Sequence, residues 1–567
     1  MFKSYNKSLR KANINSKRIK DLDPDEIFID AENLPKFDVH QFEGRIEKPI
    51  SARTFFFTGI VFLAIFVIFI VRVWYLQVEK GSEYFNRSEN NRLRETLVFA
   101  KRGVISDRNG EKIAWNVFDK SNPEFAKREY KNVSGLSHLL GYLKYPSKDS
   151  SGFYYSEAFI GKAGAEQFYD SVLSGKNGER LVEINALGNI QSESVVRLPE
   201  DGKDIVLSVD YKLQNKMYSS IESLCKDEGY VGGAGVIMDI NTGEILSMAS
   251  YPEYNSQVLT DGQDKNLINS YLKNKNTPFI DRVTDGLYTP GSIVKPFMAI
   301  AALSEKIIGQ YDNILSTGSI SLPNPYDPSH PSVFKDWKAH GYVDMRHAIS
   351  VSSDVYFYEV GGGFENQKGL GIQNINKYMK MFGFGSSTDG FFKGVDGTVP
   401  DPEWKKENFD GEDWRIGDTY HTSIGQYGFQ VSPIQAVIAV ASIANSGKII
   451  EPTILLGDRK QNIRTLSLDQ SYFEIVRDAM RLTAEEGTAK GLFYNDFRVG
   501  AKTGTAQVGA QKQYINAWAV GFFPYKNPKY AFALIMERGP ADSILGGVYP
   551  MRQTFDWMLA NRPEYTK

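Results

Sequence analysis

The stretch "GAGVIMDINTGEILSMAS", residues 233–250, places two apolar runs on either side of the turn residues Asn241, Thr242 and Gly243. A short turn containing glycine between two β-prone runs is a typical hairpin signal, because glycine adopts the positive φ that tight turns require. We therefore expect an antiparallel pair of strands here, at the start of a region that mixes strands and helices.

More strand-like runs lie near the end of the chain, in "VGAKTGTAQV" (499–508), "AWAVGFFPY" (517–525) and "YAFALIMER" (530–538). The run "MRQTFDWMLA" (551–560) has the pattern of a closing helix. Together with the hairpin, these runs predict an α+β domain at 204–567. We expect an antiparallel five-stranded sheet built from both ends of the domain, flanked by helices and with a helical insert between its halves.

Residues 78–203 have a different pattern, because turn signals such as "DRNG" (107–110) and "SGKNG" (174–178) divide them into short apolar runs. This pattern predicts an elongated, β-rich module that would form a pedestal for the domain that follows. A strand at 204–210 and an amphipathic helix at 211–226 are expected next.

Residues 54–71, "TFFFTGIVFLAIFVIFIV", carry no charge, and Arg53 and Arg72 bracket them. As a helix this segment would be roughly 27 Å long, near the hydrocarbon thickness of a bilayer. Trp74 and Tyr75 follow it, as interfacial aromatic residues do. A buried core helix is the alternative, but such helices rarely lack polar residues for so long.

We therefore expect one transmembrane signal anchor at 54–77. Cleavage is not expected, because the segment begins far from the amino terminus and no small-residue cleavage site follows it. Basic residues flank both sides, so the positive-inside bias is slight. Only 78–567 has the composition of a folded body. We expect a single-pass protein of the cell membrane with a short, polar, flexible cytoplasmic tail at 1–53 and an extracytoplasmic body.

The overall composition excludes several classes of protein. A hydrophobic content of 42% argues against wholesale disorder. The net charge is −2 and no basic block is present, so a nucleic-acid partner is not expected. Cys225 is the only cysteine, which excludes an intrachain disulfide and a cysteine-based metal cluster. Asp336 and His340 have a spacing that would suit a metal on one helix face, but no cysteine or second histidine is near. We expect no metal and no cofactor.

The segment "YTPGSIVKPF" (288–297) contains Ser292 and Lys295 with a Ser-x-x-Lys spacing that other parts of the chain share. Pro296 makes this copy different, because proline is tolerated only in the first turn of a helix. The helix must therefore begin at about Ser292, which places this serine at the positive end of the helix dipole. Lys295 would lie one turn further on the same face, where burial or a second cation makes a lysine a usable base.

The segment "KTGT" (502–505) supplies a candidate second cation, Lys502, in a strand pattern beside a glycine that lets a ligand backbone approach. An N–H group of that edge strand could join the N–H group of Ser292 in an oxyanion hole. A surface turn is the alternative. In "SVSSDVYFYEV" (350–360), Ser352 and Asp354 precede a helix, and for Ser352 a helix cap is the alternative.

These three pieces, in this order, resemble the Ser-x-x-Lys, Ser-x-Asn/Asp and Lys-Thr-Gly set of penicillin-recognising serine acyltransferases. Longer stretches are similar to class B penicillin-binding proteins. Their amino-terminal module is matched by "RLRETLVFAKRGVISDRNG" (92–110) and "GKAGAEQFYD" (161–170), and their transpeptidase domain by "AGVIMDINTGEILSMASYPEYN" (234–255), "FKDWKAHGYVDMRHAISVSSDVYFY" (334–358) and "AWAVGFFPYKNPKYA" (517–531). Roughly residues 70–560 resemble this family, and Asp354 in place of asparagine resembles its elongation-type subgroup.

The resemblance implies a peptidoglycan D,D-transpeptidase with the penicillin-binding transpeptidase and serine β-lactamase type of fold. Ser292 would attack the carbonyl between the two terminal D-alanines of a stem peptide. Lys295 would take the serine proton, and Ser352 would relay a proton to the leaving amine, with Asp354 and Lys502 shaping the local field.

The Lys-Thr-Gly strand would hold the substrate. The resemblance implies that Thr503, Gly504 and Thr505 bind the substrate carboxylate and backbone, and that the N–H groups of Ser292 and Thr505 form the oxyanion hole. An amine from a second stem peptide would complete the cross-link, and β-lactams would be trapped as slowly resolved acyl-enzymes. The family also implies a membrane glycosyltransferase and other elongation proteins as partners.

Two departures from the family pattern stand out. The gap between "DRNG" (107–110) and "HLLGYL" (138–143) is short where the family usually has an extra subdomain, so the resemblance does not extend to the partner contacts of that head. The family's "SIGQG" reads "SIGQY" (423–427) here, with Tyr427 in place of glycine and Gly428 after it.

Three alternative functions stay open at this point. A serine β-lactamase would share Ser292, Lys295 and Lys502, but no Glu-x-x-x-Asn element for deacylation is evident, and the anchor would be superfluous. A β-lactam sensor would need a signalling domain, which the polar tail at 1–53 is too short to contain. A silent scaffold would not need intact catalytic motifs.

Overall fold

The computed structural model describes residues 51–120, 122–150, 154–184, 190–324, 327, 329–458 and 463–567. The chain forms two compact units, Met1–Arg92 and Leu93–Lys567, and each is described by itself. The tail that the sequence predicts at 1–53 lies, up to residue 50, outside the described residues.

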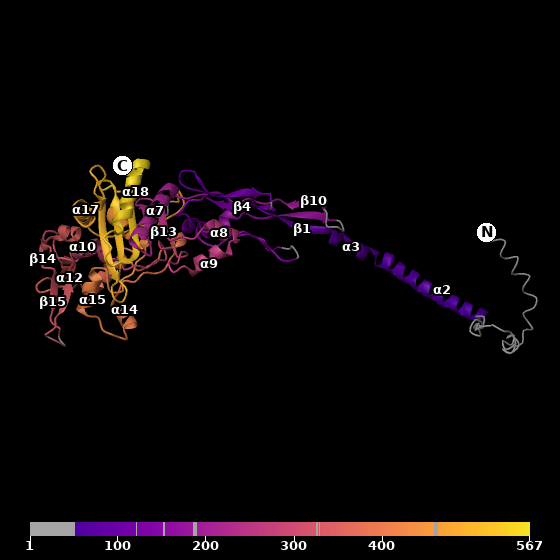
Figure 1. The fold of residues 1–567 in the computed structure, drawn as a ribbon, viewed down its shortest axis with the longest axis horizontal. Helices are drawn as coiled ribbons and strands as arrows, with labels where there is room; N and C mark the ends of the chain where they lie inside the picture. The colour runs from indigo at the N-terminus through magenta and orange to yellow at the C-terminus, as the bar shows by residue number, and fades with distance from the viewer. Residues whose placement is uncertain are drawn as a thin grey trace, which may run out of the picture. The chain divides into compact units, whose positions relative to one another are not determined.

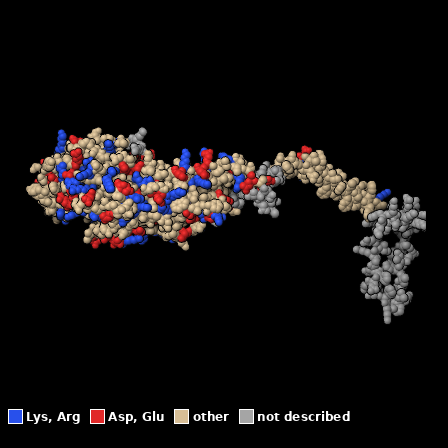
Figure 2. All heavy atoms as spheres, turned by 90° about the horizontal axis from the view of Figure 1, so that it is seen from above, with Lys and Arg blue, Asp and Glu red and all other residues tan. Residues whose placement is uncertain are grey.

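The described part of the first unit is helical. An apolar helix, α2 (Ala52–Trp74), continues into a π-helical turn, η4 (Tyr75–Glu79), and a polar helix, α3 (Gly81–Arg92), follows. No side chain of α2 is buried in protein, and Figure 2 shows almost no charged side chain along it. The stretch Ala52–Glu79 is long and apolar enough to cross a membrane. The prediction of one long apolar helix at this place is confirmed.

The second unit begins with a region of short strands (Figure 1). They form a three-stranded sheet in the order β1-β9-β10, a four-stranded sheet in the order β11-β2-β3-β4, and the pairs β5-β8 and β6-β7. The bounds are Leu93–Val98 (β1), Ile105–Ser106 (β2), Lys112–Asp119 (β3), Asn122–Tyr130 (β4), Leu143–Lys144 (β5), Ser147–Lys148 (β6), Tyr154–Ser156 (β7), Ile160–Gly161 (β8), Gly178–Ile184 (β9), Ile190–Arg197 (β10) and Ile205–Val206 (β11), with helices Ser137–Leu140 (α4), Gly164–Phe168 (α5) and Asp170–Leu173 (α6).

This region is β-rich, as the sequence predicts. The strand expected at 204–210 is shorter: β11 pairs in parallel with β2, and Leu207 after it forms only an isolated bridge with Leu455. At the centre of the region Glu166 is fully buried and accepts hydrogen bonds from two buried arginines, Arg102 at 2.6 Å and Arg128 at 2.7 Å. This ion cluster joins α5 to the segments on either side of the β2-β3 hairpin.

The remainder of the unit is built on one antiparallel five-stranded sheet in the order β13-β12-β22-β21-β20. Its strands are Gly232–Asp239 (β12), Ile245–Tyr251 (β13), Gly500–Val508 (β20), Tyr514–Phe523 (β21) and Tyr530–Pro540 (β22). The hairpin at 233–250 and the three strands near the end of the chain are therefore confirmed. β20, which carries the Lys-Thr-Gly motif, is an edge strand.

Helices cover both faces of this sheet. The helices α7 (Tyr211–Glu228) and α18 (Val548–Asn561) pack together on one face, and α16 (Pro433–Ala444) packs on the other. The side chains of β22 alternate accordingly: Phe532, Leu534 and Met536 belong to one hydrophobic core, and Ala531, Ala533 and Ile535 to the other. This period of two is what a sheet that is buried on both faces requires.

The insert between β13 and β20 is mainly helical, as predicted (Figure 1). Its helices are Ser256–Asp261 (α8), Lys265–Lys273 (α9), Lys295–Ser304 (α10), Met345–Ser350 (α11), Asp354–Gly362 (α12), Gly371–Met381 (α13), Pro402–Asn408 (α14), Ile416–Ser423 (α15), α16 and Gln470–Glu485 (α17), and its short strands are Ile314–Ser316 (β14), Ser319–Leu322 (β15), Ser332–Lys335 (β16), Gly341–Val343 (β17), Lys448–Ile450 (β18) and Ile463–Thr465 (β19).

Candidate active site

Ser292 lies in a 3-10 turn, Gly291–Val294 (η5), directly before α10. The α-helix itself begins at Lys295, three residues later than the sequence suggests. Pro296 occupies the second position of α10, where a missing N–H group costs no helical hydrogen bond. The prediction that Ser292 lies where a helix starts is therefore correct, but the turn that contains Ser292 is a 3-10 turn and not part of the α-helix.

Three contacts fix the backbone around Ser292. The indole Nε1 of Trp518 donates to Thr289 O at 3.0 Å, and Gly291 N donates to Gly425 O at 2.9 Å. The edge strand β20 passes so close that a Cβ atom on Gly504 would lie 2.6 Å from Pro290 O. A glycine is thus required at position 504, because any side chain would move β20 away from the serine turn.

Two buried lysines meet at Ser352. Lys295 Nζ donates to Asp354 Oδ1 at 2.6 Å and to Ser352 O at 2.8 Å, and it lies 3.4 Å from Ser352 Oγ. Lys502 Nζ donates to Ser352 Oγ at 2.9 Å and to Thr503 O at 2.8 Å. The side chains of both lysines are fully buried. The three sequence motifs therefore converge on one hydroxyl group.

The electrostatics of the two lysines differ. Burial lowers the pKa of Lys502 well below its usual value, the positive charge of Lys295 lowers it further, and Asp354 only partly opposes them. The single carboxylate of Asp354 is ion-paired with Lys295. Lys502, which has no carboxylate partner of its own, thus loses its proton more easily than an exposed lysine does.

The helix-cap alternative for Ser352 is excluded, because the neighbouring serine occupies the cap position. Ser353 is the residue that caps α12, because its hydroxyl accepts from Tyr356 N at 3.3 Å. Ser352 has a φ of 60°, in the left-handed region that serine rarely adopts. This conformation turns Ser352 away from the cap position and leaves its hydroxyl between the lysines.

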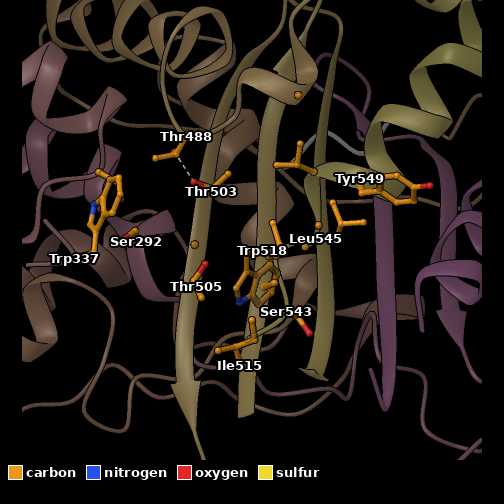
Figure 3. A pocket seen from close by; sticks show the side chains of 18 of the residues that line it. Ser292, Trp337, Thr488, Thr503, Thr505, Ile515, Trp518, Ser543, Leu545 and Tyr549 are labelled. Carbon is orange, nitrogen blue, oxygen red and sulfur yellow. Dashed lines mark hydrogen bonds between the residues drawn. The ribbon is translucent and has the colours of Figure 1, made fainter. Parts of the chain in front are cut away.

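A cleft of about 620 Å³ runs along β20 and contains Ser292. Figure 3 shows Ser292 between Trp337 and the strand that carries Thr503 and Thr505. Among the described residues, none forms a hydrogen bond with the Ser292 hydroxyl, which is therefore free to meet a ligand in the cleft. Further lining residues are Ser352, Asp354, Thr488, Gly504, Ile515, Trp518, Leu545 and Tyr549.

The predicted binding residues of β20 all line the cleft. Thr503 is half-buried and Thr505 is exposed. Lys502, which precedes Thr503, and Gly504, which lies between the two threonines, are buried. Thr488, which the sequence does not single out, shares a hydrogen bond of 2.5 Å with the Thr503 hydroxyl (Figure 3).

Sequence reasoning also misses Trp337, Trp518 and the segment 543–549, which ends in the first residues of α18; these residues complete the cleft. Thr488 lies in the turn after α17 and carries no motif of its own. Trp337 and Trp518 lie inside stretches that resemble the family, but only the fold brings them to Ser292.

The two departures from the family pattern have structural counterparts. In place of the extra subdomain, β3 and β4 form a hairpin.

Tyr427 has a φ of 61° and stacks on Phe409 with a centroid distance of 5.7 Å, while Trp404 and Trp414 contact its ring edge-on. A Cβ atom on Gly428 would lie 2.2 Å from the Trp404 ring. The tyrosine is thus part of an aromatic cluster of α14 and the segment that follows it.

The pair Asp336 and His340 is not on a helix face, since both follow β16 outside any helix. His340 Nε2 lies 3.6 Å from Asp336 Oδ1. Within the described ranges, no group of three or more His, Cys, Asp or Glu side chains is placed to hold a metal ion.

Comparisons with known proteins agree with this geometry. Residues 233–547 match the family described as "Penicillin binding protein transpeptidase domain", and residues 124–207 match "Penicillin-binding Protein dimerisation domain". The chain is 32% identical over 487 residues to the peptidoglycan D,D-transpeptidase MrdA of Salmonella typhimurium (strain SL1344), an alignment that covers 78% of this chain and 74% of the relative.

Two solved structures are similar over most of this chain. PBP2 of Pseudomonas aeruginosa, in complex with WCK 5153, has a TM-score of 0.69 at 29% identity and covers 84% of this chain and 98% of its own. PBP2 of Helicobacter pylori, in complex with MreC, has a TM-score of 0.67 at 25% identity. The match covers 83% of this chain and 99% of the Helicobacter pylori chain. With the transpeptidase match extending over more than half of its length, this chain belongs to the penicillin-binding protein transpeptidase family.

Proposed function

We propose that Ser292 is the nucleophile of this chain and that Lys295, Ser352 and Lys502 move its proton. The enzyme class follows from the family and the MrdA relatives: the chain is a peptidoglycan D,D-transpeptidase of cell-wall elongation. The observation that supports the residue roles is the convergence of two buried lysines on Ser352, beside a cleft that exposes Ser292.

The proton path follows the hydrogen bonds. Lys295 can accept the proton of Ser292 only when it is neutral. Ser352 Oγ lies 3.4 Å from Lys295 Nζ and 2.9 Å from Lys502 Nζ, so its hydroxyl can pass a proton from Lys295 to Lys502. The return of that proton through Ser352 would then protonate the leaving amine.

The acylation step exchanges one bond for another. Ser292 Oγ forms an ester with the carbonyl carbon of the penultimate D-alanine of a stem peptide, the peptide C–N bond breaks, and terminal D-alanine leaves with the relayed proton. The N–H groups of Ser292 and Thr505 would bind the oxyanion. Thr503 and Thr505, with Gly504 between them, would hold the substrate backbone and carboxylate along β20.

Deacylation completes the cross-link. The amine of a second stem peptide attacks the ester carbonyl, gives up its proton to the lysine pair, and regenerates Ser292. A β-lactam would acylate the same serine, but its ring-opened product stays attached, so the adduct resolves slowly. The rival functions, a β-lactamase, a sensor and a silent scaffold, are not favoured by the family comparison.

Labelled penicillin tests these roles directly. The purified chain is incubated with a fluorescent penicillin, and the adduct is followed over time and located by mass spectrometry of its peptides. We expect a persistent adduct on Ser292 that Ser292→Ala abolishes. Ser223→Ala is the matched control, because Ser223 has the same spacing to Lys226 but lies on α7. An adduct at another residue, or rapid turnover, would contradict the assignment.

The chain is membrane-anchored, and we infer the arrangement from the sequence. The proposed domains are a cytoplasmic tail at 1–53, an anchor at 54–77, a pedestal at 78–203 and an extracytoplasmic transpeptidase domain at 204–567. The helix at Ala52–Glu79 supports the anchor.

The partners that we propose are wall-synthesis proteins, since the Helicobacter pylori relative was solved in complex with MreC. A membrane glycosyltransferase would supply the glycan strand, whose stem peptides are the substrate.

A further inference from the structure

The acidic residue Asp336 lies outside the three motifs, yet it contacts the turn that carries Ser352. The Asp336 side chain is fully buried. Its Oδ2 atom accepts hydrogen bonds from Ser353 Oγ at 2.8 Å and from Val355 N at 3.0 Å. Both donors belong to the segment that directly follows Ser352.

The same carboxylate also contacts two other parts of the insert. Ser316 Oγ, at the end of β14, donates to Asp336 Oδ2 at 3.2 Å, and Trp337 N donates to Asp336 Oδ1 at 2.8 Å. Trp337 lines the cleft beside Ser292 (Figure 3). One buried carboxylate thus joins β14, the rim of the cleft and the Ser352 turn.

The carboxylate of Asp336 is ionised. Burial by itself would raise its pKa, but the N–H groups of Val355 and Asp354, the Ser353 hydroxyl and the charge of Lys295 together hold the pKa below its usual value. Its negative charge therefore acts on Lys295 in return, in addition to the ion pair that Lys295 forms with Asp354.

We propose that Asp336 is the positioning residue of the acylation reaction: through Ser353 and Val355 it fixes the Ser352 turn, so that the Ser352 hydroxyl stays between Lys295 and Lys502. A serine at φ 60° keeps that conformation only where its surroundings fix it. This inference rests on the roles proposed above for Ser292 and the two lysines.

The charge of Asp336 has a second consequence, for the pH dependence. The charges of Asp336 and Lys295 interact. The titratable groups that face the two lysines or Asp336 are Asp354, His340, Tyr358 and, beyond Asp354, His421. Loss of the Asp336 charge removes a nearby negative charge that favours a charged ammonium group, so we expect the acidic limb of the rate profile to move to lower pH.

The test measures the second-order rate constant for acylation by fluorescent penicillin across pH, with thermal unfolding of each variant. For Asp336→Asn we expect a rate lower by about tenfold or more, because hydrogen bonds to a charged group are lost. The acidic limb of the pH–rate profile of Asp336→Asn should lie at lower pH than that of the unaltered protein. Asp336→Glu keeps the charge and should keep the limb in place.

Two serine variants separate positioning from charge. Ser353→Ala removes a donor on the Ser352 turn and should slow acylation with the acidic limb unmoved. Ser316→Ala removes a donor to the same oxygen from β14 and should have a smaller effect. If Asp336→Asn does not fold, these two serine variants test in its place whether the hydrogen bonds of Asp336 position the Ser352 turn.

Two results would overturn the inference. One is a folded Asp336→Asn variant with the rate and pH profile of the unaltered protein. The other is Ser353→Ala with an unchanged rate. The proposed function fails separately, if the unaltered protein forms no adduct on Ser292.

Discussion

At the scale of single residues, the two buried lysines of the cleft differ in what balances their charge. Lys295 pairs with Asp354 at 2.6 Å, whereas Lys502 donates only to neutral oxygens of Ser352 and Thr503. An unbalanced buried cation costs stability, and a neutral one supplies a base. The features that make Lys502 useful to the reaction are therefore expected to destabilise the fold.

Replacement of Lys502 by methionine should separate these effects. Lys502→Met should raise the free energy of unfolding by about 1–2 kcal/mol at neutral pH, because a desolvated amine is replaced by an apolar chain. Acylation by penicillin should fall at least about a hundredfold. Urea unfolding and the adduct rate measure the two effects. Lys295→Met is the matched variant and should instead be destabilising, because it leaves Asp354 unpaired.

The pH dependence of the stability gain has a defined sign. The pKa of Lys502 is lower in the folded chain than the usual value of about 10.4. Between those two values the unfolded chain binds more protons, so the stability of the unaltered protein rises with pH through that window. The advantage of Lys502→Met should be full below the folded-state pKa and shrink as the pH approaches the usual lysine value. A stability difference that does not change with pH would contradict a depressed pKa.

At the scale of elements, Tyr427 tests how an aromatic cluster supports the serine turn. The ring stacks on Phe409, and Gly425 of the same turn accepts from Gly291 N at 2.9 Å. Tyr427→Asn keeps a residue that tolerates a positive φ but removes the ring, so we expect a loss of about 1–3 kcal/mol of stability and slower acylation. Tyr427→Phe keeps the ring and should lose less than about 1 kcal/mol. Equal effects of the two variants would exclude a packing role.

The buried ion cluster gives a second prediction at this scale. Glu166→Gln removes the ion-pair partner of Arg128, whereas Arg102 keeps its pair with Asp170 at 2.7 Å, so the β-rich region should lose about 3–5 kcal/mol of stability. Thermal unfolding measures the loss. Glu193→Gln is the control, because its pair with Arg180 is exposed and should contribute less than about 1 kcal/mol. A Glu166→Gln chain as stable as the control would show that the arginines find other partners.

The elements that the sequence predicts are those with a strong local signal. Alternation and turn residues identify the five strands, and Pro296 identifies the helix start. The left-handed φ of Ser352, the contact of Trp518 with Thr289 and the hydrogen bonds to Asp336 depend on residues that are far apart in the chain. No local pattern encodes such contacts, which is why the motif residues were predictable and their supporting residues were not.

At the scale of the whole molecule, the chain joins a membrane helix to a large folded unit whose cleft must meet its peptidoglycan substrate. The apolar stretch Ala52–Glu79 is compatible with either orientation, because basic residues flank it on both sides. A chemical label that cannot cross the membrane distinguishes the two. The composition favours this approach, since the sole native cysteine, Cys225, is buried on α7.

Lys567→Cys places one accessible thiol at position 567, which is exposed. If the transpeptidase domain is extracytoplasmic, a membrane-impermeant maleimide should label this variant in intact spheroplasts as fully as after lysis. The unaltered protein should stay unlabelled in both samples, because burial both hides the Cys225 thiol and raises its pKa to about 12, which suppresses the reactive thiolate. Labelling of Lys567→Cys only after lysis would reverse the orientation. It would also contradict the proposed extracytoplasmic placement of Ser292.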